Sequence, residues 1–427
     1  MNSTLWLLLF AGSAVADISL PVSPPPAAVP VTAAAAVPAG FEAAPVLSAT
    51  VLLGSEVAGP AYRVRERVPT DGYMAHFTID SDYGDFECIG TGQTRARIHE
   101  LGAIQKLVDL SKSDLFAEGV KRSLEQPIEA VKNIVKNPVE SVAAVPKTLG
   151  HFFKKVGQSV GNAASNLKER IDGNEEPHTD SGVGNAMRGV IGFDAAKLAC
   201  AKQLGVDPYT DNPRLQQEIE KVAWVFFSGG LPLRIGAAVV SGGASVALTA
   251  SKVVGLPEEI YALTPAELTL KNQQVMAGME VPEAVSRRYA SNQALSITLR
   301  RSILRSLQAF GEVKNRAAAV EVAANCETRR QVEFLDQALI LLVQRQQAGN
   351  SSYVALELIG RLPGVLDAKG QLLVAAPVDH LSWTPEVAEF AQREDWGGRK
   401  PCLLLGGGAS ERTRDELAAR GWSLETH

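Results

Sequence analysis

The hydrophobic period changes twice along this chain of 427 residues, and no other feature constrains its fold as strongly. Between residues 46 and 92 apolar and polar residues alternate around the turn sequences PTDG and DSDYG, which predicts a three-stranded antiparallel meander. Residues 95–171 and 191–345 instead place apolar residues at three- and four-residue spacing, which predicts helices. Residues 353–427 mix short apolar runs with helical patterns. We therefore expect an α+β protein, mainly α, with a small N-terminal β-meander and a small C-terminal α/β module.

The predicted meander needs a partner for its apolar face. In the run YMAHFTI, the side chains of Tyr73, Ala75, Phe77 and Ile79 are expected to share that face, because side chains alternate along a strand. Three strands alone bury too little surface, so we expect the helices that follow to cover them.

The N-terminus has the pattern of a signal peptide. An apolar run from Leu5 to Phe10 precedes small residues and the sequence Ala14-Val15-Ala16, which is typical of an h-region and an A-x-A cleavage site. The run is too short to span a bilayer. The segment before it lacks Lys and Arg, and a buried N-terminal helix is the alternative. We favour export, to the periplasm or outside the cell.

Composition shifts divide the remaining chain. Residues 17–45 are rich in Pro and Ala and are expected to form an extended tether, and the polar, Gly-rich residues 172–189 are expected to separate two helical regions. The predicted organisation is a signal peptide at 1–16, a tether at 17–45, the meander with amphipathic helices at 46–172, a helical domain at 190–345 and an α/β module at 353–427.

An eleven-residue unit occurs twice in succession, as QPIEAVKNIVK and NPVESVAAVPK between residues 126 and 147. An eleven-residue period keeps an apolar stripe on one face of a helix. Pro127 and Pro138 would each cost about 3 kcal/mol inside a helix but little in its first turn. The repeat therefore predicts short amphipathic helices jointed at the prolines.

Positively charged residues are concentrated around this repeat. Residues 121–170 contain nine Lys and Arg but four Glu, a local charge of +5 in a chain whose net charge is −5. A basic amphipathic segment suits an anionic membrane surface or a partner protein of the cell envelope. The alternative is that its apolar face packs on the meander. If the segment makes such a contact, the candidate contact residues are Lys132, Lys136, Phe152, Phe153, Lys154 and Lys155.

A second unusual segment is apolar. Residues 235–251 carry no charge and contain Gly236, Gly242 and Gly243 among small residues and valines. This length is at the lower limit for a membrane span, and Pro232 and Arg234 interrupt the longer run 222–255. We favour a buried core helix over membrane insertion.

Motifs for catalysis and for ligand binding are few. Gly406-Gly407-Gly408 leads to Ser410 at a predicted helix N-cap, but the loop has neither a Walker Lys nor the G-x-G-x-x-G spacing. Asp379 and His380 follow a predicted strand, where neighbouring side chains point to opposite faces and so do not form a dyad. The acidic run DSDYGDFE (80–87) predicts a polar hairpin turn, and GVDPYTDNP (205–213) predicts a turn before a helix.

Histidine and cysteine spacing indicates no metal site. The six histidines are scattered, and the four cysteines form no C-x-x-C. An exported chain could form two disulfides from Cys88, Cys200, Cys326 and Cys402, and isolated buried thiols are the alternative. We expect no metal and no cofactor.

These patterns favour an exported, non-enzymatic cell-envelope protein that contacts a membrane surface or a partner through residues 121–170. The net charge of −5 and the pI of about 5.8 speak against nucleic acid as a partner. One alternative is an exported hydrolase-like enzyme with a site near Asp379 and residues 406–410. Another is a membrane-inserting or pore-forming protein that uses residues 222–255.

Overall fold

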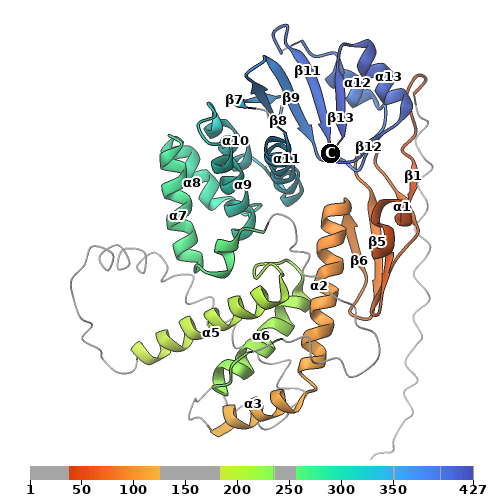
Figure 1. The fold of residues 1–427 in the computed structure, drawn as a ribbon. Helices are drawn as coiled ribbons and strands as arrows, with labels where there is room; N and C mark the ends of the chain where they lie inside the picture. The colour runs from red at the N-terminus through yellow and green to blue at the C-terminus, as the bar shows by residue number, and fades with distance from the viewer. Residues whose placement is uncertain are drawn as a thin grey trace, which may run out of the picture. The chain divides into compact units, whose positions relative to one another are not determined.

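The fold is α+β and mainly helical, with small antiparallel sheets near the N-terminus and a mixed sheet near the C-terminus. Figure 1 shows the computed structural model, which describes residues 38–125, 183–233, 235, 256–349, 352–394 and 396–426. Residues Phe41–His427 form one compact unit. The architecture is therefore the one that the periodicity of the sequence predicts.

The predicted meander is present as part of a larger arrangement. Strands β3, β5 and β6 are the three that the alternation predicts, and a short strand β2 extends them to a four-stranded antiparallel sheet of order β2-β3-β5-β6. Strands β1 and β4 pair separately. The bounds are β1 Val46–Ser48, α1 Ala49–Leu53, the 3-10 helix η1 Gly54–Val57, β2 Ala58–Gly59, β3 Tyr62–Val64, β4 Arg67–Pro69, β5 His76–Ser81 and β6 Phe86–Ile89.

The apolar face of this sheet is as predicted, with one exception. Ala75, Phe77 and Ile79 are fully buried in one core. Tyr73, expected beside them, lies before β5 begins, and its hydroxyl forms a 2.6 Å hydrogen bond with the hydroxyl of Thr384. The turn at residues 71–74 therefore directs Tyr73 toward the C-terminal module.

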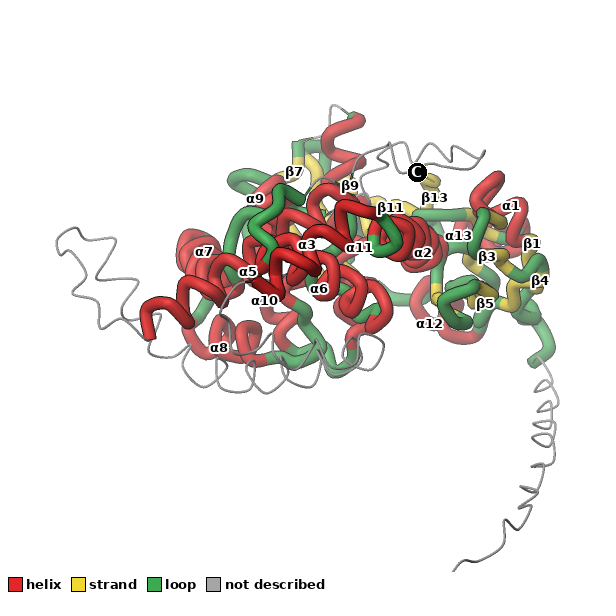
Figure 2. The backbone as a smooth tube through the Cα atoms, turned by 90° about the horizontal axis from the view of Figure 1, so that it is seen from below, coloured by secondary structure: helices red, strands yellow, loops and turns green. Residues whose placement is uncertain are grey.

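Helices cover the sheet, as its exposed apolar face requires. The sheet shares a core with α2, α5 and α6 through Leu101, Ile104, Cys200, Ile219 and Phe226, and Figure 2 shows α3, α5 and α6 close together. Asn212 caps α6 and Pro213 occupies its first turn, as the sequence NP predicts. The bounds are α2 Thr91–Leu110, α3 Asp114–Glu125, α5 Val183–Leu204 and α6 Pro213–Ser228.

The second helical region surrounds its own core. Tyr289, Ile303, Leu307, Leu339 and Leu342 are completely buried in it. Capping boxes at the N-termini of α7 and α11 satisfy the first backbone N–H groups of these helices. The bounds are η3 Glu258–Tyr261, α7 Pro265–Gly278, α8 Glu283–Ser291, α9 Ile297–Ala309, α10 Arg316–Ala324 and α11 Arg329–Ala348.

The C-terminal module is a five-stranded mixed sheet of order β13-β11-β9-β8-β7. Strands β7, β8 and β9 are antiparallel, and β9, β11 and β13 are parallel. Lys369 and Gly370 lie in the hairpin connection between β8 and β9. The bounds are β7 Tyr353–Ile359, β8 Leu362–Asp367, β9 Gln371–Ala376, β10 His380–Leu381, α12 Pro385–Ala391, β11 Lys400–Leu405, β12 Gly408–Ala409, α13 Glu411–Ala419 and β13 Ser423–Thr426.

Alternation along β9 and β11 buries both faces of this sheet. Leu373 and Leu404 belong to the core of the helical region, where α11 packs on β8 and β9. Leu372 and Leu403 belong to a separate core with Trp422 and helices α12 and α13, which Figure 1 shows beside the sheet. The sheet of the module is therefore the middle layer of an α/β/α arrangement, between the helical region and helices α12 and α13.

Candidate functional site

The residues predicted to contact a membrane or partner lie outside the described residues. This holds for Lys132, Lys136, Phe152, Phe153, Lys154 and Lys155, and for the whole repeat. The structure describes the helices on either side, α3 and α5, and both pack on α6. The described helices before and after the repeat therefore contact the same helix.

The glycine loop at the carboxyl ends of β9 and β11 is closed by backbone contacts. The amide of Gly406 donates to the carbonyl of Ala376 at 3.1 Å, and the amide of Gly408 donates to the carbonyl of Asp379 at 3.0 Å. A Cβ atom on Gly407 would collide with that same carbonyl. The glycines thus permit the close approach of two backbone segments, and Ser410 caps α13 as predicted.

Asp379 joins this loop to the N-terminal part of the chain. Its carboxylate accepts hydrogen bonds from the amide of Ala75 at 2.9 Å, and from the amide and hydroxyl of Thr91 at 3.0 and 2.8 Å. Thr91 is the first residue of α2, whose own N-cap residue, Gly90, has no side chain to offer. Asp379 therefore caps α2 from a distant part of the sequence and complements the positive end of that helix.

Glu42 makes a second link of the same kind. Its carboxylate accepts hydrogen bonds from the amide of Trp383 at 2.6 Å and the hydroxyl of Ser410 at 2.5 Å, at the N-terminus of α13. Burial raises the pKa of Glu42, but the hydrogen bonds from Ser410, Trp383 and Thr413 outweigh it and lower the pKa below its ordinary value. The carboxylate is thus held in its charged form.

The edge of the sheet that commonly binds ligands in α/β proteins is covered by the chain itself. Besides Glu42 and Asp379, the carbonyl of Tyr73 accepts hydrogen bonds from the amides of Asp379 and His380, and the carbonyl of Gly72 accepts one from Ser382. The carboxylate of Asp379 bonds to Ala75 and Thr91, so Asp379 and His380 form no dyad. Here the polar groups join two parts of the fold.

The other acidic stretches are structural too. Asp80 of β5 pairs with Arg65, which follows β3, at 2.7 Å. Residues 82–85 form the turn between β5 and β6, as predicted for a polar hairpin. Asp207 is half-buried and accepts a 2.6 Å hydrogen bond from the hydroxyl of Thr298, while burial of its carboxyl raises its pKa. The described residues contain no cluster of three or more side chains suited to a metal ion.

Asp211 connects two regions of the fold. Its carboxylate pairs with Arg97 of α2 at 2.9 Å and with Arg329 of α11 at 3.4 Å. Since Asp207 in the same loop bonds to Thr298 of α9, residues 205–213 act as a polar junction between the N-terminal helices and the second helical region.

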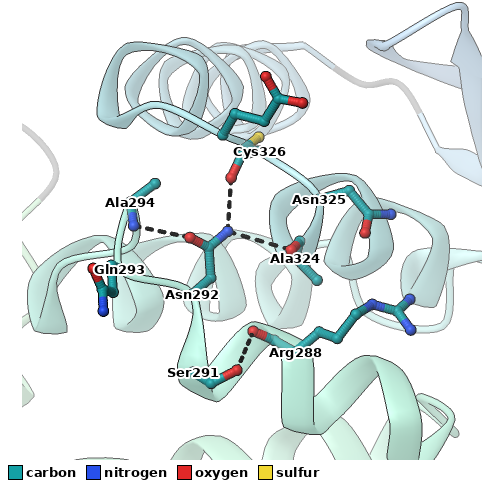
Figure 3. Close-up of a pocket in the computed structure, with 9 residues that line it drawn as sticks. Arg288, Ser291, Asn292, Gln293, Ala294, Ala324, Asn325 and Cys326 are labelled. Atoms are coloured by element: carbon teal, nitrogen blue, oxygen red, sulfur yellow. Dashed lines mark hydrogen bonds between the residues drawn. The ribbon is translucent and has the colours of Figure 1, made fainter.

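A hollow of about 400 Å³ lies where α8 and α10 end, as Figure 3 shows. The side-chain nitrogen of Asn292, Nδ2, donates to the backbone carbonyls of Cys326, Ala323 and Ala324 at 2.8, 3.3 and 3.3 Å. Its side-chain oxygen accepts from the amide of Ala294. Asn292 therefore braces the end of α10. The hollow is lined by Arg288, Ser291, Asn292, Gln293, Ala294, Ala324, Asn325, Cys326 and Glu327.

All four cysteines are unpaired, so the alternative of isolated thiols is the one observed. Cys88, Cys200 and Cys402 are buried and Cys326 is half-buried. Burial raises the pKa of Cys88 to about 11 and that of Cys200 to about 12. These two thiols are therefore protonated, and poor nucleophiles, at neutral pH.

The apolar segment 222–255 is described in part. Residues 222–228 belong to α6, where Val222, Ala223 and Phe226 are buried, and most of residues 234–255 lie outside the described residues. Within the part that the structure describes, no helix combines the length and apolar character needed to cross a membrane.

Three residues with defined roles here were not singled out from the sequence. Glu42, Thr91 and Asn292 each complete a helix end or a link between distant segments. Only Asn292, in the polar stretch between two helical patterns, carries a local signal typical of capping. Neither protein-family models, nor curated proteins, nor solved structures include a match to this chain.

Proposed function

We propose that this protein is an exported, non-enzymatic protein of the cell envelope that binds an anionic membrane surface through residues 121–170. The observation that carries the proposal is the separation of charge: this segment has a charge of +5, which leaves −10 on the rest of the chain. Its apolar residues recur with an eleven-residue period beside those lysines. Both properties are typical of segments that lie on anionic lipid.

The described residues support this proposal in two ways. The carboxyl edge of the C-terminal sheet, where the enzyme alternative would place its site, is covered by Glu42, Asp379 and residues 72–73. In addition, α3 and α5 pack on the same helix, α6. Substitutions between them can therefore test binding while the helices that flank the segment stay attached.

The test is co-sedimentation of the full chain with vesicles of phosphatidylcholine, alone or mixed with phosphatidylglycerol. We expect binding to the mixed vesicles only, and weaker binding at about 1 M than at about 0.1 M salt, because salt screens the attraction. Each lysine near an anionic surface contributes about 1 kcal/mol. Changing Lys132, Lys136, Lys154 and Lys155 together to Gln should thus weaken binding by roughly 10²–10³-fold.

A matched control removes the same charge elsewhere. Lys106, Lys112, Lys369 and Lys400 are exposed, and their joint change to Gln should leave most of the binding intact. Equal losses in the two variants would reduce the effect to net charge and refute the proposed segment. Release of a trapped dye from the same vesicles would instead support the membrane-inserting alternative.

A further inference from the structure

A carboxyl group lies buried between two helices of the second helical region. Asp336, on α11, has 4% of its surface exposed and faces α9, with which α11 packs closely. Its neighbours on α11, Val332, Leu335 and Leu339, belong to the apolar core. An acid at the centre of a helix–helix contact loses its hydration when the protein folds.

The surroundings of Asp336 do little to compensate a negative charge. Its carboxyl hydrogen-bonds the hydroxyl of Ser302 on α9, while Oδ1 has no hydrogen-bond partner. No ion pair involves Asp336 among the described residues. A buried carboxylate without a cation and with an unpaired oxygen costs several kcal/mol, so the neutral acid is the favoured form.

The titratable groups near Asp336 also favour its neutral form. On α11 itself, Glu333 lies one turn away, and its negative charge disfavours a second one, although it pairs with Arg329 at 2.7 Å. On α8, the hydroxyl of Tyr289 is fully buried and donates to the carbonyl of Arg300 at 2.7 Å.

Arg300 and Arg301 of α9 bond to groups other than Asp336. Arg300 donates to the carbonyl of Asn292 at 2.7 Å, and Arg301 pairs with Glu259 at 3.1 Å. Thus neither guanidinium bonds to Asp336, and both would have to leave their present partners to neutralise it.

We propose that Asp336 is a pH-responsive latch between α9 and α11, which holds the contact as a neutral carboxylic acid and weakens it on ionisation. The proton leaves the buried carboxyl for solvent, and the carboxylate that remains is unpaired inside the core. The proposal does not depend on the proposed membrane contact.

The expected pH window follows from linkage. Burial raises the pKa of Asp336 from its ordinary 3.8 to about 7 in the folded protein. A raised pKa of an acid means that folding takes up a proton between these values, so stability is full below pH 3.8 and is lost as pH rises to about 7. Across this window the unfolding equilibrium constant should rise about tenfold per pH unit through Asp336 alone.

The test compares denaturant unfolding of the wild type and Asp336→Asn from pH 5 to 8. The amide imitates the neutral acid but does not ionise, so the wild type should lose stability relative to the variant as pH rises. Glu333→Gln removes the same charge one turn away. The loss of stability with rising pH should remain, with its midpoint at slightly lower pH because a negative charge beside Asp336 is gone. Parallel pH curves for wild type and Asp336→Asn would refute the latch.

A direct measurement covers the case in which Asp336→Asn does not fold. The carboxyl carbon of Asp336 in the wild-type protein, followed by NMR, should titrate near pH 7. A midpoint below pH 5 would show a charged carboxylate at neutral pH and would overturn the proposal.

Discussion

Removal of the Asp379 carboxylate should separate the C-terminal module from the N-terminal sheet. The change Asp379→Ala deletes three hydrogen bonds and leaves the amides of Ala75 and Thr91 without their partner. Hydrogen bonds to charged groups contribute about 1.5–3 kcal/mol each, and loss of a helix cap costs about 0.5–2 kcal/mol. Because the bond to the Thr91 amide is also the cap, these terms overlap, and we expect a loss of about 3–5 kcal/mol.

Asp379→Asn should cost less, about 2 kcal/mol, since one oxygen can still accept while the new amide group faces an N–H donor. Asp415→Ala, on the exposed surface of α13, is the control and should change stability by less than about 0.5 kcal/mol. The ordering of the three variants tests whether the hydrogen bonds of Asp379, and not charge alone, join the two regions.

The assay is denaturant unfolding, monitored in the same samples by tryptophan fluorescence and by circular dichroism. Trp383, Trp396 and Trp422 belong to the core of the C-terminal module, so fluorescence mainly reports on that module while dichroism reports on the helices. In Asp379→Ala the fluorescence transition should shift to lower denaturant than the dichroism transition. Coincident transitions at the wild-type midpoint would refute the reasoning.

Two further predictions concern the same edge of the sheet. Glu42→Gln should destabilise the protein by about 1 kcal/mol at neutral pH, because it weakens the hydrogen bond to Ser410 at the N-terminus of α13. The pKa of Glu42 is lowered in the folded protein, so its contribution to stability is present above pH 4.5 and is lost as the pH falls. The unfolding curves of the variant and the wild type should therefore converge in acid. A constant difference at all pH values would contradict this. Gly407→Ala should cost about 1–3 kcal/mol because its Cβ collides with the carbonyl of Asp379, whereas Gly92→Ala, in α2 with no atom within 4 Å of the new Cβ, should gain about 0.4–1 kcal/mol in thermal unfolding. Equal effects at the two glycines would remove the argument from close backbone approach.

The features predicted well from the sequence are those that depend on neighbouring residues. The alternation of Ala75, Phe77 and Ile79 reports a buried sheet face, and the N-caps at Asn212 and Ser410 follow from their side chains. Local periodicity is sufficient for an element such as β5, which has one apolar face to bury.

The links between distant segments could not be predicted in this way. The place of Asp379 after a predicted strand is typical of a catalytic residue, but its partner Thr91 is 288 positions away in the sequence. Nothing in the residues around Glu42 indicates that it bonds to Ser410, the N-cap residue of α13. Such contacts depend on how whole elements pack. The predicted position of Tyr73 is wrong because the turn at 71–74 interrupts the alternation of apolar and polar residues.

The two classes of substitution should affect different quantities: one should lower stability and the other should lower membrane binding. Asp379 and Glu42 join segments 41–91 and 379–413, far from residues 121–170 in the sequence, so their loss should lower stability while folded protein still binds anionic vesicles. The change of Lys132, Lys136, Lys154 and Lys155 to Gln should lower binding without lowering the denaturant midpoint, because uncharged, flexible side chains replace others of similar length. If the lysine variant instead loses stability in step with binding, the basic segment packs on the fold, as the alternative interpretation of its apolar stripe holds. In that case the lysines act through the structure and the membrane contact is refuted.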